Sequence, residues 1–155
     1  MSTFKIFSGG QTGVDRAALD AAIDLNIEHG GWCPLGRLAE DGPVHGRYNL
    51  LETNSSEYTQ RTKMNVNDSD ATLVIYDKDL KGGTRLTWQY ANKINKPCYL
   101  LNISGKFDPD SIINWLRSNS VKTLNIAGPR ASQNPTIYKK AKKIITLLIT
   151  TYTQE

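Results

Sequence analysis

The stretch FKIFSGGQTGVDRAALDAAIDL, which runs from Phe4 to Leu25, decides the fold. Residues 4–8 are typical of a short strand, and they lead directly into the glycine-rich turn 9–13. Beyond that turn, apolar residues recur at helical spacing, and the aspartates fall off that stripe. Thr12, followed three positions later by Asp15, predicts a capping box at the start of this helix. The chain therefore begins as a strand, a glycine turn and a helix, which together open a βα unit.

Strands and helices alternate again from residue 58 onward. The run 71–76 is apolar, unalternating and β-branched, as central parallel strands are. The other expected elements are a weak helix over 58–68, a helix that follows Thr84 and ends near Ile94, helices over 108–117 and from Asn134 onward, and strands over 98–103 and 123–127. This alternation predicts an α/β fold with a Rossmann-like, doubly wound, mainly parallel sheet and helices on both faces.

Between these regions, residues 28–58 form an irregular, loop-rich insert. Glycine and proline recur often from Gly30 to Gly46, and no helical or strand period survives between them. Short strands are expected near 31–33 and 50–51. Because the chain has 155 residues and neither internal repeats nor a linker, we expect one domain spanning 1–155.

Composition and charge argue against several classes of protein. The chain is 39% hydrophobic and 22% charged, which is the globular range, and its formal net charge of +4 favours anionic ligands. No apolar run approaches the roughly 18 residues that cross a membrane, and no secretory signal is recognisable, so we expect a cytoplasmic protein. The lysines over 139–143 surround a helix without interleaved aromatics, which argues against nucleic-acid binding. Two cysteines and two histidines are too few for a dedicated zinc site, and we expect no metal ligands.

Three strand ends carry glycine and hydroxyl residues, and each is followed by a helix. Ligands of open α/β sheets bind at these carboxyl ends, where backbone N–H groups and helix N-termini favour anions. We therefore interpret the three loops as a site for a phosphate-bearing ligand. The candidate binding residues are Gly9, Gly10, Gln11, Thr12, Gly13, Gly82, Gly83, Thr84, Arg85, Gly128, Pro129, Arg130 and Ser132. The alternatives are tight turns, ordinary threonine helix caps, a solvated Arg85, and an Arg130 paired with a surface carboxylate.

Two familiar nucleotide motifs are missing from these loops. The series GGQTG over 9–13 is not the GxGxxG dinucleotide fingerprint, and no acidic residue ends a second strand where a ribose would need it. No Gly-Lys-Ser/Thr follows the first loop, so the chain has no Walker A motif. NAD binding and P-loop ATP hydrolysis are therefore not expected.

The sequence resembles the molybdenum cofactor carrier proteins over nearly its whole length. The segments that carry the resemblance are SGGQTGVDRAALDAA (8–22), GGWCPLGRLAEDG (30–42), RTKMNVNDSDATLVI (61–75), GGTRLT (82–87) and NIAGPRAS (125–132). These carriers are small Rossmann-like proteins of the superfamily that includes the LOG nucleoside-monophosphate phosphoribohydrolases. The resemblance implies a homo-oligomer, commonly a homotetramer, that binds the molybdenum cofactor (Mo-molybdopterin), a phosphorylated pterin. It also implies that the carrier protects this cofactor without catalysis and delivers it to molybdoenzyme clients.

One position bears on the enzymatic alternative. The LOG enzymes carry a PGGxGTxxE loop whose glutamate serves hydrolysis of the N-glycosidic bond, and the corresponding loop here is 82–87. Thr87 stands in the place of that glutamate, and a neutral hydroxyl cannot take a carboxylate's role in this hydrolysis. Two alternatives to the carrier stay open: a hydrolase of nucleotides or other phosphoribosyl compounds, and a nucleotide sensor without turnover.

Several further residues are weighed between a ligand role and a structural one. Trp32 is interpreted as a core or interface anchor rather than a platform for a pterin ring. Cys33 is interpreted as a small buried residue rather than a molybdenum ligand. Arg37 and Arg61 are candidates for charge near the ligand. The acidic pair Glu40–Asp41 is interpreted as a cap of a turn.

Overall fold

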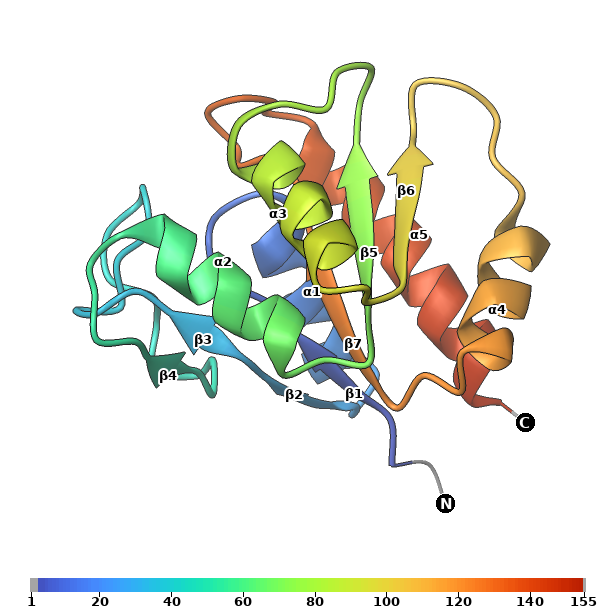
Figure 1. Cartoon of the computed structure of the whole chain (residues 1–155), viewed down its shortest axis with the longest axis horizontal. Coiled ribbons are helices and arrows are strands. Elements are labelled where there is room, and N and C mark those ends of the chain that lie inside the picture. The colour runs from blue at the N-terminus through green and yellow to red at the C-terminus, as the bar shows by residue number, and fades with distance from the viewer. Residues whose placement is uncertain (1–2, 155) are drawn as a thin grey trace.

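The computed structural model describes residues 3–154 and contains a five-stranded sheet between two helical layers (Figure 1). The strands lie in the order β2-β1-β7-β5-β6, and all neighbouring pairs are parallel. Their bounds are β1 (Lys5–Phe7), β2 (Glu28–Gly30), β5 (Ala71–Tyr76), β6 (Cys98–Asn102) and β7 (Thr123–Ala127). The predicted Rossmann-like α/β class is confirmed.

Helices cover both faces of this sheet. Their bounds are α1 (Val14–Asp24), α2 (Tyr58–Asn67), α3 (Gly82–Lys93), α4 (Pro109–Ser118) and α5 (Ile137–Thr153). On one face α1 packs against α5, with α4 beside α5, and on the other face α2 packs against α3 (Figure 1). The main apolar core lies between the sheet and the layer of α1, α4 and α5.

The strand order places a switch point at the centre of the sheet. From β1 the chain moves outward to β2, whereas from β5 it moves outward to β6 on the other side. Because all strands are parallel, their carboxyl ends share one edge, and the β1–α1, β5–α3 and β7–α5 loops meet there. Open α/β sheets bind ligands at this position.

Burial explains why β5 was predictable. The strand lies between β7 and β6 and is buried from Ala71 to Ile75, so both faces of its ribbon are covered. A strand that is covered on both faces needs apolar residues without alternation.

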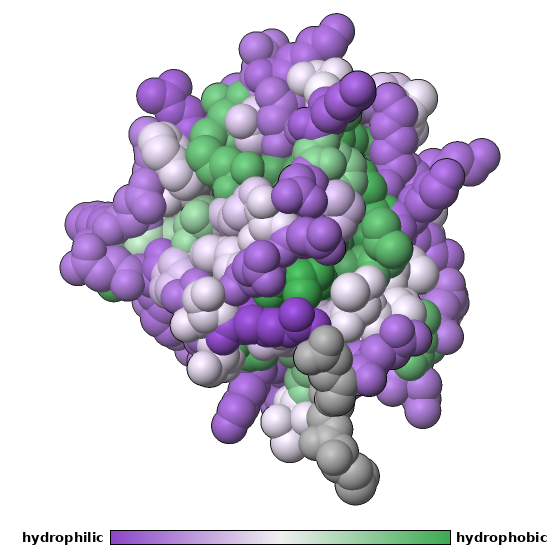
Figure 2. Space-filling view, turned by 90° about the vertical axis from the view of Figure 1, so that its right-hand side faces the viewer, coloured by the Kyte–Doolittle hydropathy of each residue, from purple (hydrophilic) through white to green (hydrophobic). Residues whose placement is uncertain are grey.

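The β6 edge of the sheet is covered in part by α4. The Tyr99 ring of β6 packs against the Trp115 ring of α4, with 5.4 Å between the ring centroids. On this side of the molecule, hydrophilic side chains protrude and apolar surface is visible between them (Figure 2).

Three expected helix starts differ from the structure. The capping box at α1 is wrong: Gly13 is the N-cap, and no side chain caps the helix. The fifth helix begins at Ile137 rather than Asn134, because residues up to Thr136 form turns. The third helix begins at Gly82, so the glycine pair Gly82–Gly83 is inside its first turn rather than before it.

The insert is more regular than its composition suggests. It supplies the edge strand β2, which the sequence did not reveal, and a small parallel sheet of β3 (Trp32–Cys33) and β4 (Leu51–Glu52) near the expected positions. The Arg37 guanidinium donates to the carbonyls of Val44, His45, Tyr48 and Leu50, at 2.9 to 3.2 Å. Arg37 therefore organises the insert and does not reach the strand ends. Cys33 is fully buried in a second apolar cluster, as expected.

Candidate functional site

A cavity of about 320 Å³ opens at the shared carboxyl edge of the strands. Its walls come from the β1–α1 loop, from α2, from the first two turns of α3 and from the end of β7. The volume lies at the lower end of the range of small-molecule sites. Members of all three predicted loops line it: Gly9, Gln11, Gly82, Gly83, Thr84, Gly128 and Arg130. The predicted residues outside its lining are Gly10, Thr12, Gly13, Arg85, Pro129 and Ser132.

The β1–α1 loop uses its own backbone donors internally. The Gly10 N–H donates to Ser8 Oγ at 3.4 Å, which is a long hydrogen bond. The Gln11 N–H donates to Asp15 Oδ2 at 3.3 Å, and the Thr12 N–H donates to Gln11 Oε1 at 3.0 Å. The N–H groups of residues 10–12 are therefore not free to bind a phosphate, although the glycine-rich sequence of this turn predicts that they would be.

The side-chain amide of Gln11 is a buried donor that this loop leaves unpaired. Its Oε1 accepts hydrogen bonds from the backbone N–H groups of Thr12 and Glu40, at 3.0 and 2.8 Å. Two N–H donors on one amide atom identify that atom as the oxygen. Nε2 is then buried in the cavity wall and has no hydrogen-bond partner in the described part of the chain. The whole residue is only 6% exposed. A buried donor without an acceptor is rare in proteins and points to a ligand.

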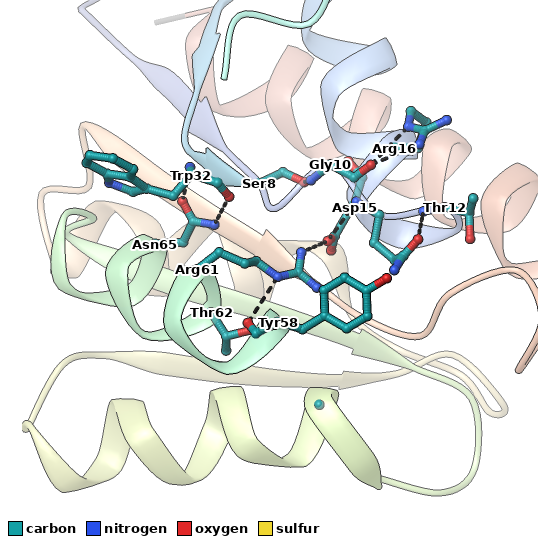
Figure 3. Close-up of polar contacts among 12 residues, drawn as sticks. Ser8, Gly10, Thr12, Asp15, Arg16, Trp32, Tyr58, Arg61, Thr62 and Asn65 are labelled. Carbon is teal, nitrogen blue, oxygen red and sulfur yellow. Dashed lines mark hydrogen bonds and ion pairs between the residues drawn. The ribbon is translucent and has the colours of Figure 1, made fainter. Parts of the chain in front are cut away.

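A buried ion pair joins α1 to α2 beneath the cavity. Arg61 Nη1 lies 2.8 Å from Asp15 Oδ2, and the two side chains are only 12% and 7% exposed (Figure 3). The Arg61 guanidinium also lies over the Tyr58 ring, 5.3 Å from its centroid. A Cβ added at Gly9 would overlap this guanidinium, so glycine is required where the arginine crosses the loop.

Burial and pairing act in opposite directions on Asp15. Desolvation raises the pKa of its carboxyl above the ordinary value, and this effect outweighs the lowering by the Arg61 charge and its hydrogen bond. The ion pair with Arg61 therefore lowers the pKa of a carboxyl whose burial raises it.

The β7–α5 loop is tied to the insert through Glu40. The Glu40 carboxylate accepts hydrogen bonds from the Thr12 hydroxyl, from the Ser132 N–H at 3.0 Å and from Ser132 Oγ at 2.6 Å. These hydrogen bonds lower the pKa of Glu40. Arg130 Nε lies 3.7 Å from Glu40 Oε1, which is too long for a hydrogen bond, and this nitrogen is buried without a partner in the described residues.

The first turn of α3 presents free backbone donors to the cavity. No hydrogen bond among residues 3–154 uses the N–H of Gly82, Gly83 or Thr84, and α3 has no side-chain cap. Nothing lies within 4 Å of a Cβ built at Gly83, so this turn faces open space. Three free N–H groups and the helix dipole favour an anion here. Arg85 is exposed and points away from the lining.

Position 87 lies on the cavity wall. The Thr87 hydroxyl donates to the Gly83 carbonyl at 2.9 Å, so its proton is already used within α3. The side chain at position 87 is therefore a neutral hydroxyl rather than a carboxylate.

Of the polar stripe of α2, the sequence identified only Arg61, as a candidate for charge near the ligand. Tyr58, Arg61, Thr62 and Asn65 all line the cavity, and their spacing of three and four residues places them on one helix face. That spacing is the signal that could have found them. Asp15 was missed because its position is also that of a helix cap.

Trp32 lies outside the cavity lining. Its indole N–H donates to Asp68 at 2.8 Å, and the Asn65 side chain pairs with its backbone N–H and carbonyl at 2.7 and 3.0 Å. These contacts fasten β3 to α2, which is the anchoring role. Among residues 3–154, no three His, Cys, Asp or Glu residues gather into a metal-binding group. No helix in the same range has the length and apolar character that spanning a membrane requires.

A parallel sheet with a cavity at its switch point defines a Rossmann-like protein with a candidate site for a small ligand. Residues 6–149 match the model of the circularly permutated YpsA SLOG family, and the chain belongs to this family. A crystal structure described as "Putative molybdenum carrier protein" from Syntrophus aciditrophicus SB shares 44% sequence identity, with a TM-score of 0.86. That comparison covers 96% of this chain and 94% of the other. No curated protein matches this chain significantly. The resemblance drawn from the sequence is confirmed.

Proposed function

We propose that this protein binds the molybdenum cofactor as its cargo, in the cavity at the carboxyl edge of the sheet, and holds it without catalysis. The proposal rests on one observation: unpaired hydrogen-bond donors line a cavity of the size of a small-molecule site. The first turn of α3 offers three N–H groups to a phosphate, and the buried amide of Gln11 lacks an acceptor. The similarity to a protein described as a molybdenum carrier supports the same role.

The donor set suits the organic part of the cofactor. Backbone N–H groups at a helix N-terminus bind phosphate, and side-chain amides and carboxylates bind polar heterocycles. We propose that the phosphate and the pterin are recognised and that the protein walls shield the metal. We also propose a cytoplasmic location, a homotetrameric or other homo-oligomeric assembly, and delivery of the cofactor to molybdoenzymes. Light scattering tests the assembly.

A loading experiment tests the function directly. Free molybdenum cofactor is mixed with the purified protein without oxygen, unbound material is removed, and retained pterin is quantified by fluorescence after oxidation. We expect nearly stoichiometric retention that excess AMP does not reverse. Displacement by AMP without turnover would instead establish a nucleotide sensor. Release of free base from nucleotides would establish a hydrolase.

Gly83→Asp is expected to weaken cofactor retention by about tenfold or more, because it places a negative charge beside the proposed phosphate position. The fold should be unchanged, since a Cβ built at Gly83 meets nothing within 4 Å. Gly46→Asp is the matched control: its Cβ also meets nothing within 4 Å, and Gly46 lies in the insert outside the cavity lining. Equal retention by the two variants would remove α3 from the site.

A further inference from the structure

The two ends of the cavity differ in the kind of atom that they can bind. At the α3 end, the free polar groups are the backbone N–H donors of the first turn. At the β1–α1 end, the unpaired Gln11 Nε2 is a donor and Asp15 is an acceptor. Asp15 Oδ2 accepts from Arg61 and from the Gln11 backbone, whereas no hydrogen bond among residues 3–154 uses Oδ1.

Gln11 and Asp15 meet at this end of the cavity. The Gln11 backbone N–H donates to the Asp15 carboxylate at 3.3 Å, and both residues line the cavity. Neither can turn away easily, because the Gln11 amide oxygen holds two N–H donors and the Asp15 carboxylate is paired with Arg61. This end of the cavity therefore holds a fixed donor and a fixed acceptor, on two residues that are both buried.

An anion is poorly suited to this end. The N–H groups of residues 10–12 in the β1–α1 loop are already used, and the Asp15 carboxylate would repel a phosphate. A neutral ring with an N–H next to a carbonyl satisfies both groups at once, because the N–H donates to the carboxylate and the carbonyl accepts from the amide. Such a lactam edge is common to pterins and to guanine.

We infer that Asp15 and Gln11 recognise the lactam edge of the bound heterocycle, while the first turn of α3 holds its phosphate. This inference rests on the proposed function and deepens it, because it assigns the orientation of the cargo. Gln11 and Asp15 then determine specificity, and Arg61 acts as a positioning residue through Asp15.

Two simple probes separate the ends of the cavity. Unphosphorylated pterin reports on the lactam end through its own fluorescence, and inorganic phosphate reports on the α3 end by calorimetry. Gln11→Glu should weaken pterin binding by about tenfold or more, because a carboxylate then faces the ring carbonyl. Phosphate affinity should change less than about twofold. Gly83→Asp should give the opposite pattern.

Asp15→Asn provides a second, isosteric variant, and circular dichroism checks that it folds, because it leaves the Arg61 charge without its carboxylate. It should also weaken pterin binding by about tenfold and leave phosphate binding intact or stronger. If either folded variant loses phosphate binding and retains pterin binding, the orientation is reversed and the inference is overturned. Equal binding of pterin by wild type and both variants overturns it as well.

The comparison of GMP with AMP identifies the source of the lactam edge. Adenine reverses the donor and acceptor of this edge, so AMP should bind at least about tenfold more weakly than any ligand with a lactam. Tighter binding of GMP than of pterin phosphate would assign the edge to guanine. Failure of the loading experiment with a persistent pterin response would reject the carrier role and retain the lactam site.

Discussion

Replacing Arg61 by methionine is expected to destabilise the protein by about 3 kcal/mol at neutral pH, because it leaves the Asp15 carboxylate buried without a partner. Methionine preserves most of the apolar stem of the arginine, so the loss reports on the charge. Ligand binding should fall with it, since Arg61 both lines the cavity and holds Asp15 in place. Denaturant unfolding measures the change in free energy of unfolding.

The pH dependence of this variant gives a second readout. Burial already raises the pKa of Asp15 in the folded wild type, and loss of the Arg61 charge raises it further. A carboxyl with a raised folded-state pKa contributes stability at low pH and loses it as pH rises through that pKa. The destabilisation by Arg61→Met should therefore shrink as pH falls below about 4, the ordinary pKa of an unfolded aspartate, because Asp15 then becomes protonated in the unfolded chain as well as in the folded variant.

Two further variants control this experiment. Asp15→Asn combined with Arg61→Met should recover most of the lost stability, since no unpaired charge then remains buried. Arg85→Met should change stability by less than about 0.5 kcal/mol, because Arg85 is exposed and outside the cavity lining. A loss with Arg61→Met that is the same at all pH values would show that the arginine acts by packing alone.

Replacing Gly13 by alanine is expected to cost about 3 kcal/mol or more. Gly13 has a φ of 80° and a ψ of −129°, a conformation that residues with a Cβ rarely adopt and that costs them about 1 to 3 kcal/mol. Its Cβ would also overlap the backbone carbonyl of Pro129, and overpacking of this kind adds about 1 to 3 kcal/mol. The overlap arises where the β1–α1 and β7–α5 loops touch, as the hydrogen bond from the Val14 N–H to the Pro129 carbonyl at 3.2 Å shows.

Thermal unfolding compares Gly13→Ala with Gly46→Ala. Gly46 has an ordinary φ, and its added Cβ meets nothing within 4 Å, so this control should unfold near the wild-type temperature. Similar unfolding temperatures for the two variants would mean that the two loops can move apart without loss of stability. The close approach at Gly13 would then not contribute to the stability of the fold.

The fold was largely predictable because its signals are local. A central parallel strand such as β5 must be apolar on both faces, and α1 must carry an apolar stripe, so each element is visible in its own residues. The insert gave weaker signals because distant partners hold it together. Its order depends on Arg37 binding four carbonyls and on Trp32 binding Asn65, and no pattern of neighbouring residues reveals such contacts.

The sequence predicted the loops that form the site, but it did not predict which hydrogen-bond donors in those loops are free. Glycines, hydroxyls and helix starts indicated three strand ends, and members of all three line one cavity. Only some donors are free, because hydrogen bonds within the β1–α1 loop use the N–H groups of residues 10–12, and the Glu40 carboxylate accepts from the hydroxyls of Thr12 and Ser132. Sequence spacing cannot reveal which donors already have partners.

The sequence by itself determined the α/β class, the order of the main elements, the three loops at the strand ends and the resemblance to the carrier family. These features depend on residue periodicity and on motifs that are contiguous in the chain. Only the tertiary structure decided that Asp15 and Arg61 form a buried pair, that Gln11 keeps an unpaired donor, and that α3 presents the free N–H groups. The physical reason is that burial and hydrogen-bond partners arise from residues far apart in the chain, which meet only after the parallel strands bring their carboxyl ends together.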